Sequence, residues 1–144
     1  MFVVLCMIAA ALLPLVSDHA RAVEYPNPYM AVTGENAGDI AGRSVALMDL
    51  DGDGYADLIV GAPLDDDDDL MSGKVLIFLG GDAETDPDVV ILGSNGEQFG
   101  FSVARAGDVN GDGIDDLVVG APKNDTNEID AGVAYIFYLS LIHI

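Results

Sequence analysis

Hydrophobic residues in this chain occur in short runs separated by polar and flexible positions. Beyond residue 22, runs of four to six residues rich in Val, Ile, Leu and aromatic side chains alternate with Gly, Asp and Pro. No window beyond that point sustains a helical period over about ten residues, so the pattern predicts β-strands. The predicted strands are 44–48, 57–62, 74–79, 89–92, 101–106, 116–121 and 133–138.

An internal repeat organises these strands. Residues 49–63 read DLDGDGYADLIVGAP and residues 108–122 read DVNGDGIDDLVVGAP, with 10 identities in 15 positions at an offset of 59 residues. Upstream, GRSVA at 42–46 matches GFSVA at 100–104 at an offset of 58 residues. The second copy therefore gains one residue before its acidic stretch.

The repeat continues downstream, where residues 73–79 align with residues 132–138. Four antiparallel strands in a repeat of about 60 residues are typical of a β-propeller blade, which buries its faces against neighbouring blades. We therefore expect an all-β chain of two four-stranded blades, at 23–92 and 93–138, with the second blade incomplete. Both are expected to belong to a propeller of about seven blades.

The N-terminal segment has the features of a secretion signal. Residues 1–16 are almost entirely apolar, and this run is shorter than the roughly 20 residues that a membrane-spanning helix needs. Ala20-Arg21-Ala22 offers small residues at a cleavage site, so residues 1–22 are expected to be removed and the protein to be secreted or held at the cell surface. An uncleaved anchor and a buried strand are the alternatives.

The C-terminal residues 139–144 read LSLIHI, which resembles the translation of a transposase adaptor used in preparing sequencing libraries. The repeat stops matching at the same place, because Gly80-Gly81 in the first copy faces Leu139-Ser140 in the second. These residues are therefore expected to be an artefact that interrupts a longer native chain.

Composition excludes several classes of function. The chain has 25 acidic residues against 5 Lys and Arg, a formal charge of −20, which disfavours binding to nucleic acid or to an anionic membrane. With 51% hydrophobic residues it is too apolar for a disordered acidic tail. The only His and Cys residues, His19, His143 and Cys6, lie in the terminal segments, so catalysis by Ser-His or Cys-His pairs, zinc sites and disulfides are not expected.

Candidate chemistry lies in two acidic loops that occupy the same place in each repeat. Side-chain oxygens recur at positions 1, 3, 5 and 9 of each loop, position 7 offers a backbone carbonyl, and a glycine at position 6 permits a sharp bend. Hard oxygen ligands in this number favour calcium, so two calcium sites are predicted. Their ligands are Asp49, Asp51, Asp53, Tyr55 and Asp57 in the first loop and Asp108, Asn110, Asp112, Ile114 and Asp116 in the second.

Other ions and other families of calcium-binding loop are alternatives for these two acidic loops. Converging carboxylates repel by about 1 to 4 kcal/mol per pair, so without a cation the loop should open or take up protons. A solvated Asp-Gly turn and a magnesium or manganese site remain alternatives. An EF-hand needs a Glu where Val60 and Val119 stand, dockerin modules need a helix after the loop, and aspartate-rich thrombospondin-type repeats need cysteines.

Several short motifs of the second copy follow one another in a fixed order: Phe99-Gly100, Ser102-Val103-Ala104, DVNGDG at 108–113, and Gly120-Ala121-Pro122. Together they resemble the FG-GAP repeat of the integrin α-subunit β-propeller, and the resemblance covers residues 39–138. Related repeats occur in secreted bacterial proteins and in glycosylphosphatidylinositol-specific phospholipase D. The resemblance implies a calcium loop between the first two strands of each blade and ligand recognition elsewhere. The first copy departs from it, with Ala41-Gly42 in place of Phe-Gly.

These observations lead to a functional hypothesis. We expect a non-catalytic, calcium-binding extracellular module for cell adhesion or for binding a protein or glycan ligand, in which calcium stiffens the loops. The alternative is a non-catalytic propeller attached to a larger secreted enzyme, such as a phospholipase D-like hydrolase. Neither nucleic-acid binding nor membrane insertion of the mature chain is expected.

Four weaker features were also interpreted. The run Asp65–Asp69 is expected to face solvent, with a secondary cation or partner site as the alternative. Asn124-Asp125-Thr126 is a glycosylation sequon, meaningful in a eukaryotic secretory pathway. Aromatic residues on the strands are expected to pack in the core or between blades, and no acid–base partner is assigned to Lys74. The aromatic residues are Phe78, Tyr135 and Phe137.

Overall fold

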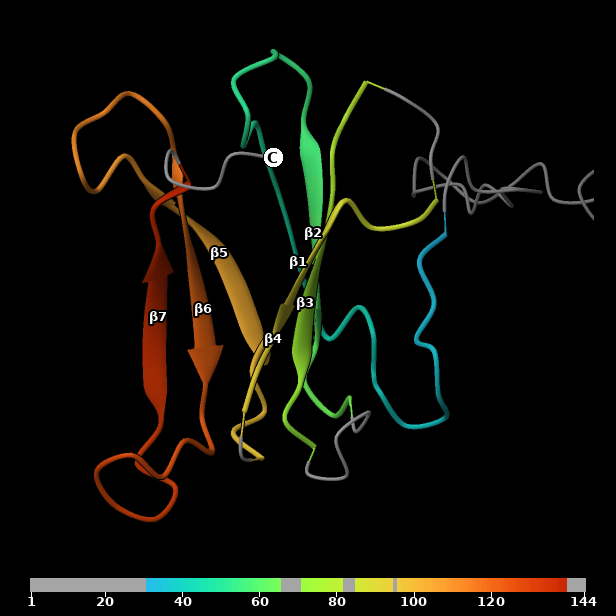
Figure 1. Cartoon of the computed structure of the whole chain (residues 1–144), viewed down its shortest axis with the longest axis vertical. Coiled ribbons are helices and arrows are strands. Elements are labelled where there is room, and N and C mark those ends of the chain that lie inside the picture. Colours follow the sequence, from blue (N-terminus) through green and yellow to red (C-terminus); the bar gives the residue numbers. More distant parts are fainter. Residues whose placement is uncertain (1–30, 66–70, 82–84, 95, 140–144) are drawn as a thin grey trace, which may run out of the picture.

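Two antiparallel β-sheets stand side by side in the computed structural model of the chain (Figure 1). The structure describes residues 31–65, 71–81, 85–94 and 96–139. Blade 1 has the strand order β1 (Ser44–Met48), β2 (Asp57–Ala62), β3 (Lys74–Phe78) and β4 (Val89–Leu92). Blade 2 has the order β5 (Ser102–Gly107), β6 (Asp116–Ala121) and β7 (Val133–Phe137). The all-β prediction is confirmed, and the described residues contain no α-helix.

All seven predicted strands are present, and those that differ in extent do so by one residue at one or both ends. Consecutive strands pair antiparallel, as short connections dictate. The residue gained in the second copy forms a β-bulge: β5 pairs with β6 through Arg105 and Gly107, and Ala106 is skipped. Among the described residues no helix has the length and apolarity to cross a membrane.

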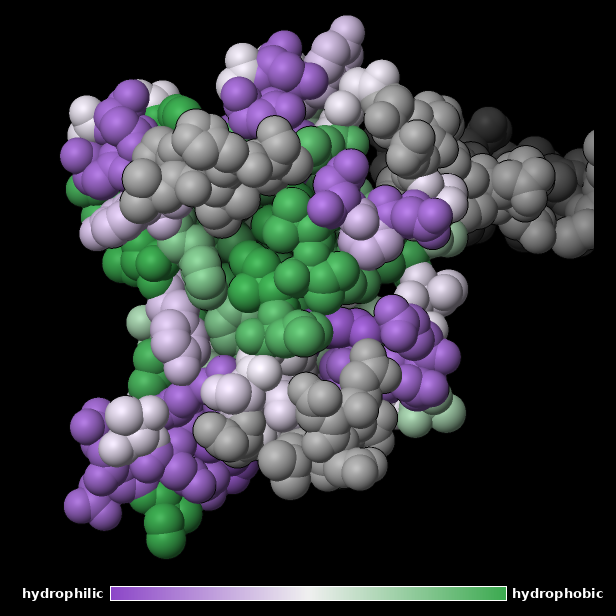
Figure 2. Space-filling view, viewed as in Figure 1, coloured by the Kyte–Doolittle hydropathy of each residue, from purple (hydrophilic) through white to green (hydrophobic). Residues whose placement is uncertain are grey.

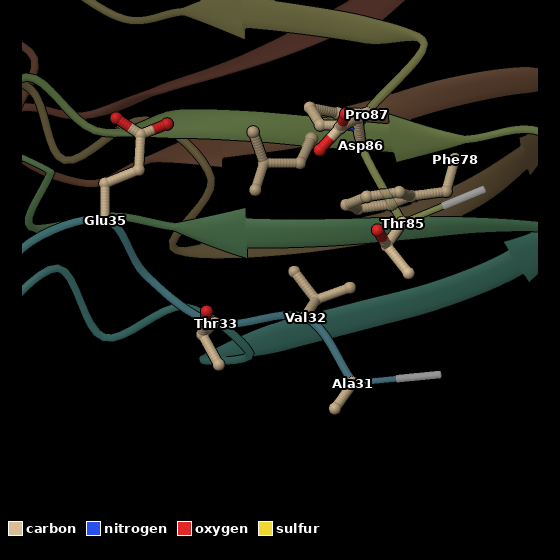
Figure 3. A pocket seen from close by; sticks show the side chains of 9 residues that line it. Ala31, Val32, Thr33, Glu35, Phe78, Thr85, Asp86 and Pro87 are labelled. Atoms are coloured by element: carbon tan, nitrogen blue, oxygen red, sulfur yellow. The ribbon is translucent and has the colours of Figure 1, made fainter. Parts of the chain in front are cut away.

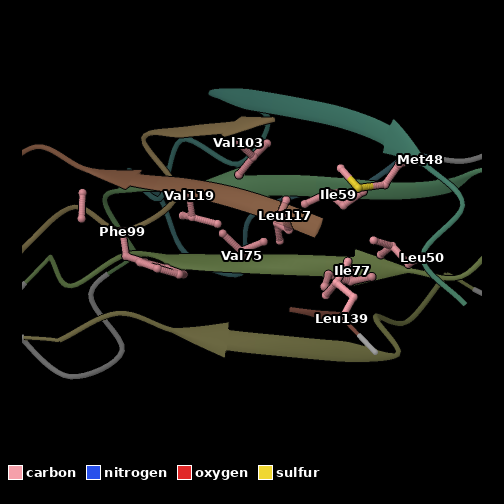
Figure 4. Close-up of a cluster of buried hydrophobic side chains, with 11 residues drawn as sticks. Met48, Leu50, Ile59, Val75, Ile77, Phe99, Val103, Leu117, Val119 and Leu139 are labelled. Atoms are coloured by element: carbon pink, nitrogen blue, oxygen red, sulfur yellow. The ribbon is translucent and has the colours of Figure 1, made fainter. Parts of the chain in front are cut away.

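The hydrophobic core lies between the two blades rather than within either of them. Alternate residues of each strand point to one face, and the facing sides of β2, β3, β5 and β6 interlock (Figure 4). Leu139, which the adaptor-like motif includes, is also buried in this cluster. The buried members carried by the labelled strands are Met48, Ile59, Val75, Ile77, Val103, Leu117, Val119 and Ala121. Each blade therefore depends on its neighbour for burial.

Figure 2 shows how this arrangement distributes polarity on one face of the molecule. Hydrophobic residues gather at mid-height, over the sheets, and hydrophilic residues dominate the loops at both ends. This separation follows from short apolar strands joined by Asp- and Gly-rich turns. It leaves the loop ends as the places where polar chemistry can be built.

The distance between the blades is set by a close approach of backbones. Gly100 has a φ of 84° and its carbonyl oxygen lies over Gly61, where an added Cβ would come within 2.0 Å of that oxygen. The hydroxyl of Ser44 donates a hydrogen bond to the same carbonyl at 2.8 Å. Only glycine at position 61 leaves room for this contact. Gly61 of the first repeat thus makes room for the Phe99-Gly100 turn of the second repeat.

Phe99 fills the space next to this contact. Its ring is 2% exposed and packs against the rings of Tyr135 at 5.6 Å and Phe137 at 5.9 Å between centroids. On the blade 1 side, Phe78 is also buried. The expectation that Phe78, Tyr135 and Phe137 pack in the core or between blades is confirmed.

The first repeat has Ala41 where the second has Phe99, and the packing differs accordingly. The counterparts of Tyr135 and Phe137 are Leu76 and Phe78, and both line a cavity of about 300 Å³ on the outer face of blade 1. Val32 covers part of this face, and Figure 3 shows the cavity between the segment 31–35 and Pro87. The cavity is lined by Ala31, Val32, Thr33 and Glu35 on one side and by Thr85, Asp86 and Pro87 on the other.

The two equivalent motif glycines provide a test of the backbone contact. Gly61→Ala should lower the free energy of unfolding by about 3 kcal/mol, because its Cβ collides with a carbonyl that cannot rotate away. Gly120→Ala should cost less than about 1 kcal/mol, since the nearest atom to its Cβ is the rotatable Ser102 hydroxyl. Chemical unfolding of the two variants measures the difference. Equal losses would show that the contact does not fix the spacing of the blades.

Candidate metal centre

The first acidic loop gathers three carboxylates from different parts of a hairpin. Asp49 follows β1, Asp51 lies in the turn, and Asp57 is the first residue of β2. One oxygen of each lies within 4.8 Å of the others. Three converging carboxylates with a partly open side fit a hard divalent cation.

Hydrogen bonds from the backbone hold these side chains in place. The two oxygens of Asp49 accept from the amides of Gly52 at 2.8 Å and Gly54 at 3.0 Å. Asp51 accepts from the amide of Asp53 at 3.0 Å. Asp and Asn side chains favour such turns because they bond to amides a few residues ahead. The loop is therefore shaped by the same carboxylates that would bind an ion.

Asp57 connects the loop to the rest of the sheet. It is fully buried, and its two oxygens accept from the amides of Leu50 at 2.5 Å and Gly80 at 2.7 Å. Burial raises the pKa of its carboxyl, hydrogen bonds from Gly80 and Leu50 lower it in part, and the negative charges of Asp51 and Asp49 raise it further. A cation would offset the repulsion that contributes to this shift.

The second loop repeats the bonding pattern of the first, and the amide of Asp112 also donates to Asp108 at 3.0 Å. Asp108 accepts from Gly111 at 2.6 Å and Gly113 at 2.9 Å, matching the bonds to Asp49. Asn110 takes the place of Asp51 and accepts from Asp112 at 3.0 Å. The remaining bonds are Ile114 to Asp112 at 2.9 Å, Val109 to Asp116 at 2.8 Å and Leu139 to Asp116 at 3.4 Å. Two different sequences thus adopt one loop geometry.

The other predicted ligands lie in the same loops but outside the gathered trio. Asp53 is exposed, and one of its oxygens accepts from the amide of Tyr55 at 2.7 Å. Asp112 makes the equivalent contact in the second loop. Tyr55 and Ile114 were proposed for their carbonyls, and the Tyr55 side chain is 61% exposed. Of the ligands predicted for the first loop, Asp49, Asp51 and Asp57 therefore lie close together, and Asp53 and Tyr55 lie outside that group.

The amides of Leu50 and Gly80 were missed by the sequence analysis. They come from opposite sides of the hairpin and fix both oxygens of Asp57. The adjacent glycines Gly80-Gly81 after β3 were the available signal, because an added Cβ at Gly80 would lie 2.6 Å from the carbonyl oxygen of Ala56. A contact between residues 23 positions apart is not encoded in local spacing.

One expectation about the acidic run is wrong. Asp65 does not face solvent: it is 4% exposed, and its carboxylate lies 2.6 Å from the ammonium of Lys74. Lys74 is equally buried and also lies 3.3 Å from Glu35, so it has the ionic partners that the sequence did not reveal. The rest of the run, 66–69, lies outside the described residues. Asp65 is held beside the start of β3, because its backbone carbonyl accepts from the amide of Gly73 at 3.1 Å.

The predictions of a signal peptide and of an adaptor-derived C-terminus concern residues that lie almost entirely outside the described part of the chain. The signal segment 1–22, with Cys6 and His19, precedes residue 31, where the description begins. Residues 140–144, with His143, follow its end.

Comparisons with known proteins agree with the repeat and its blades. The family model described as FG-GAP repeat matches residues 41–78 and 99–137. Integrin alpha-PS2 of Drosophila melanogaster is 37% identical over 117 residues, which are 74% of this chain and 8% of that protein. Integrin alpha-3 of Mus musculus is 34% identical over 111 residues, 74% of this chain and 10% of the relative.

Integrin alpha-7 of Mus musculus is 40% identical over 105 residues, 71% of this chain and 9% of the relative. The chain therefore spans 8 to 10% of the length of these curated relatives.

Asp57 should matter to the fold even without an ion. In a chelator, Asp57→Ala should lower the free energy of unfolding by about 2 kcal/mol, because the unpaired amides of Leu50 and Gly80 cost more than the relief of repulsion from Asp49 and Asp51. Asp53→Ala, at an exposed turn, is the matched control and should cost less than about 1 kcal/mol. Thermal unfolding compares them. A larger loss for the control would contradict the assigned bridging role.

Proposed function

The chain belongs to the FG-GAP repeat family, and from this membership we propose that it forms part of an extracellular, calcium-stabilised β-propeller that serves adhesion or ligand binding. The observation that carries the proposal is the loop geometry common to both repeats. Integrin α chains are among its relatives, and we infer that its partner is a protein or glycan outside the cell.

Calcium is the proposed ion for both loops. The donors are all oxygens, and loops built on Asx turns can adjust to the variable coordination that calcium accepts, whereas magnesium requires a near-ideal octahedron. The first site would use Asp49, Asp51, Asp53, Asp57 and the Tyr55 carbonyl. The second would use Asp108, Asn110, Asp112, Asp116 and the Ile114 carbonyl. Bound calcium would supply positive charge that balances the converging carboxylates.

The proposed role of the loops is mechanical rather than catalytic. Asp57 holds Leu50 at the end of β1 and Gly80 after β3, so immobilising its carboxylate fixes three strands relative to one another. Asp116 holds Val109 and Leu139 in the same way in blade 2. The described residues include no His or Cys that could act as a base or nucleophile beside these loops. This composition supports a scaffold that presents ligand-binding loops.

Export is part of the same proposal. The apolar segment 1–16 and the small residues before position 23 support cleavage of a signal peptide, and calcium loops of this kind suit the calcium concentration outside cells. We assign 23–92 to blade 1 and 93–138 to blade 2. This division follows the repeat, with the blades meeting near residue 93.

Calorimetric titration of the secreted chain tests the ion. Calcium should bind at two sites, the first more tightly because it has four carboxylates against three. Asp49→Ala should remove the first site alone and Asp108→Ala the second alone, with each variant serving as the control for the other. An Asp53→Ala, Asp112→Ala double variant should weaken both. Heat no greater than that of magnesium, or unchanged binding in all variants, would refute the assignment.

Calcium binding should also weaken as the pH is lowered. The pKa of Asp57 lies above the usual range of an aspartate in the chain without an ion, mainly because the carboxyl is buried. Only the ionised carboxylate can bind calcium, so protons compete with calcium as the pH falls through that raised pKa. In the ion-free chain the same raised pKa makes the Asp57 contribution to stability more favourable at acidic pH. The rise in melting temperature on adding calcium should therefore shrink between about pH 7 and about pH 4.5. A constant rise would contradict competition at this carboxyl.

A further inference from the structure

The sequon Asn124-Asp125-Thr126 occupies an unusual position for a glycosylation site. It lies in the loop between β6 and β7, where Asp125 and Thr126 are exposed. Asn124 itself is 8% exposed. The residue that would accept a glycan therefore points inward from a loop that otherwise faces solvent.

A closed set of hydrogen bonds uses the whole side chain of Asn124. Its Nδ2 donates to the Glu97 carboxylate at 2.5 Å and to the Tyr135 hydroxyl at 3.0 Å. The Tyr135 hydroxyl donates to the same Glu97 oxygen at 2.8 Å. The side-chain oxygen of Asn124, Oδ1, accepts from the backbone amide of Thr126 at 2.9 Å. Both Nδ2 hydrogens are thus engaged, and we call the buried Glu97 and Asn124 and the half-buried Tyr135 the triad.

The triad joins three parts of blade 2. Glu97 lies in the segment that enters β5, and its carbonyl also accepts from the amide of Lys123 at 3.1 Å. Asn124 begins the loop after β6, and Tyr135 lies on β7. Glu97 is 3% exposed, so its carboxylate has no solvent to replace these donors. Two residues further along, Phe99 is wedged between the blades.

The first repeat shows that this position is buried by the fold. Asp65 occupies the place of Asn124 in the first repeat. The backbone carbonyl of Asp65 accepts from the amide of Gly73 at 3.1 Å, just as the backbone carbonyl of Asn124 accepts from the amide of Gly132 at 3.0 Å. Asp39 occupies the place of Glu97, and its backbone carbonyl accepts from the amide of Leu64 at 3.3 Å. Both Asp39 and Asp65 are buried. An aspartate cannot accept a glycan, so the position serves packing in one repeat independently of any sequon.

Glycan transfer is incompatible with this arrangement. The reaction joins Nδ2 to the anomeric carbon of the sugar, breaks the bond from that carbon to a lipid-linked diphosphate, and removes one proton from Nδ2. One of the two donated bonds would be lost, and the sugar would have to fit at a residue that is 8% exposed. The buried Glu97 carboxylate would lose a donor that water cannot replace.

We propose that Asn124 is a structural residue of blade 2 and that the folded chain carries no glycan at this sequon. A chain that receives a glycan before blade 2 folds cannot complete the triad. Glycosylation at this position and the native packing of Glu97 therefore exclude each other.

Expression in a eukaryotic secretory host tests the proposal, with peptide mass spectrometry of the secreted, folded chain. Asn124 should be unmodified. Ile129→Thr gives a matched control, because it completes a sequon that begins at exposed Asn127 in the same loop, and Ile129 is 86% exposed. That variant should gain one glycan, at Asn127 alone. A glycan on Asn124 of secreted chain with a native unfolding transition would overturn the proposal.

A second comparison separates the sequon from the side chain. Thr126→Ala destroys the sequon and keeps the triad, so its melting temperature should stay within about 1 °C of the parent chain. Asn124→Ala also destroys the sequon but removes two bonds to buried groups, and its melting temperature should fall by about 5 °C or more. Equal melting temperatures for the two variants would show that Asn124 has no structural role.

Discussion

The contact on which the rest of the structure depends is the approach of the Gly100 carbonyl to Gly61. A blade of short strands has two apolar faces and no interior, so it is stable only when a neighbour covers a face. The glycine brings the two sheets close enough for Val75 and Leu117 to share one core, and Ser44 anchors the approaching carbonyl. Phe99 then seals the interface against Tyr135 and Phe137.

The acidic loops inherit their rigidity from this packing. Asp57 and Asp116 are the first residues of β2 and β6, the strands at the centre of the order β1-β2-β3-β4 and of β5-β6-β7, and each is fully buried. Each carboxylate therefore faces a loop on one side and fixed amides on the other. An ion bound there would act on strands as well as on the turn, which is why a loop without catalytic groups can still serve function. Asp57 in blade 1 and Asp116 in blade 2 are therefore the residues where the fold and the proposed ion chemistry meet.

The sequence predicted the strands and the repeat well because both depend on local pattern. Alternation, turn glycines and the offset of 59 residues defined the strands to within one residue. The change of offset from 58 to 59 showed that the second copy gains one residue, and the structure places it as a bulge at Ala106. The trio Asp49, Asp51 and Asp57 was also predictable, since its members lie within one hairpin. The pairing of Asp65 with Lys74 was not predictable, because a run of aspartates is typical of a solvated loop and local spacing does not show that its first member is buried against a lysine.

The sequence by itself determined the β-class, the repeat and the oxygen-rich loops, because these follow from period, spacing and side-chain chemistry along the chain. Only the tertiary structure decided which polar residues are buried: Asp57 beneath its loop, Asp65 against Lys74, and Asn124 between Glu97 and Tyr135. Burial depends on what arrives from distant parts of the chain. The roles of the sequon, the acidic run and Lys74 therefore depend on packing, which removes water and leaves each buried polar group dependent on its protein partners.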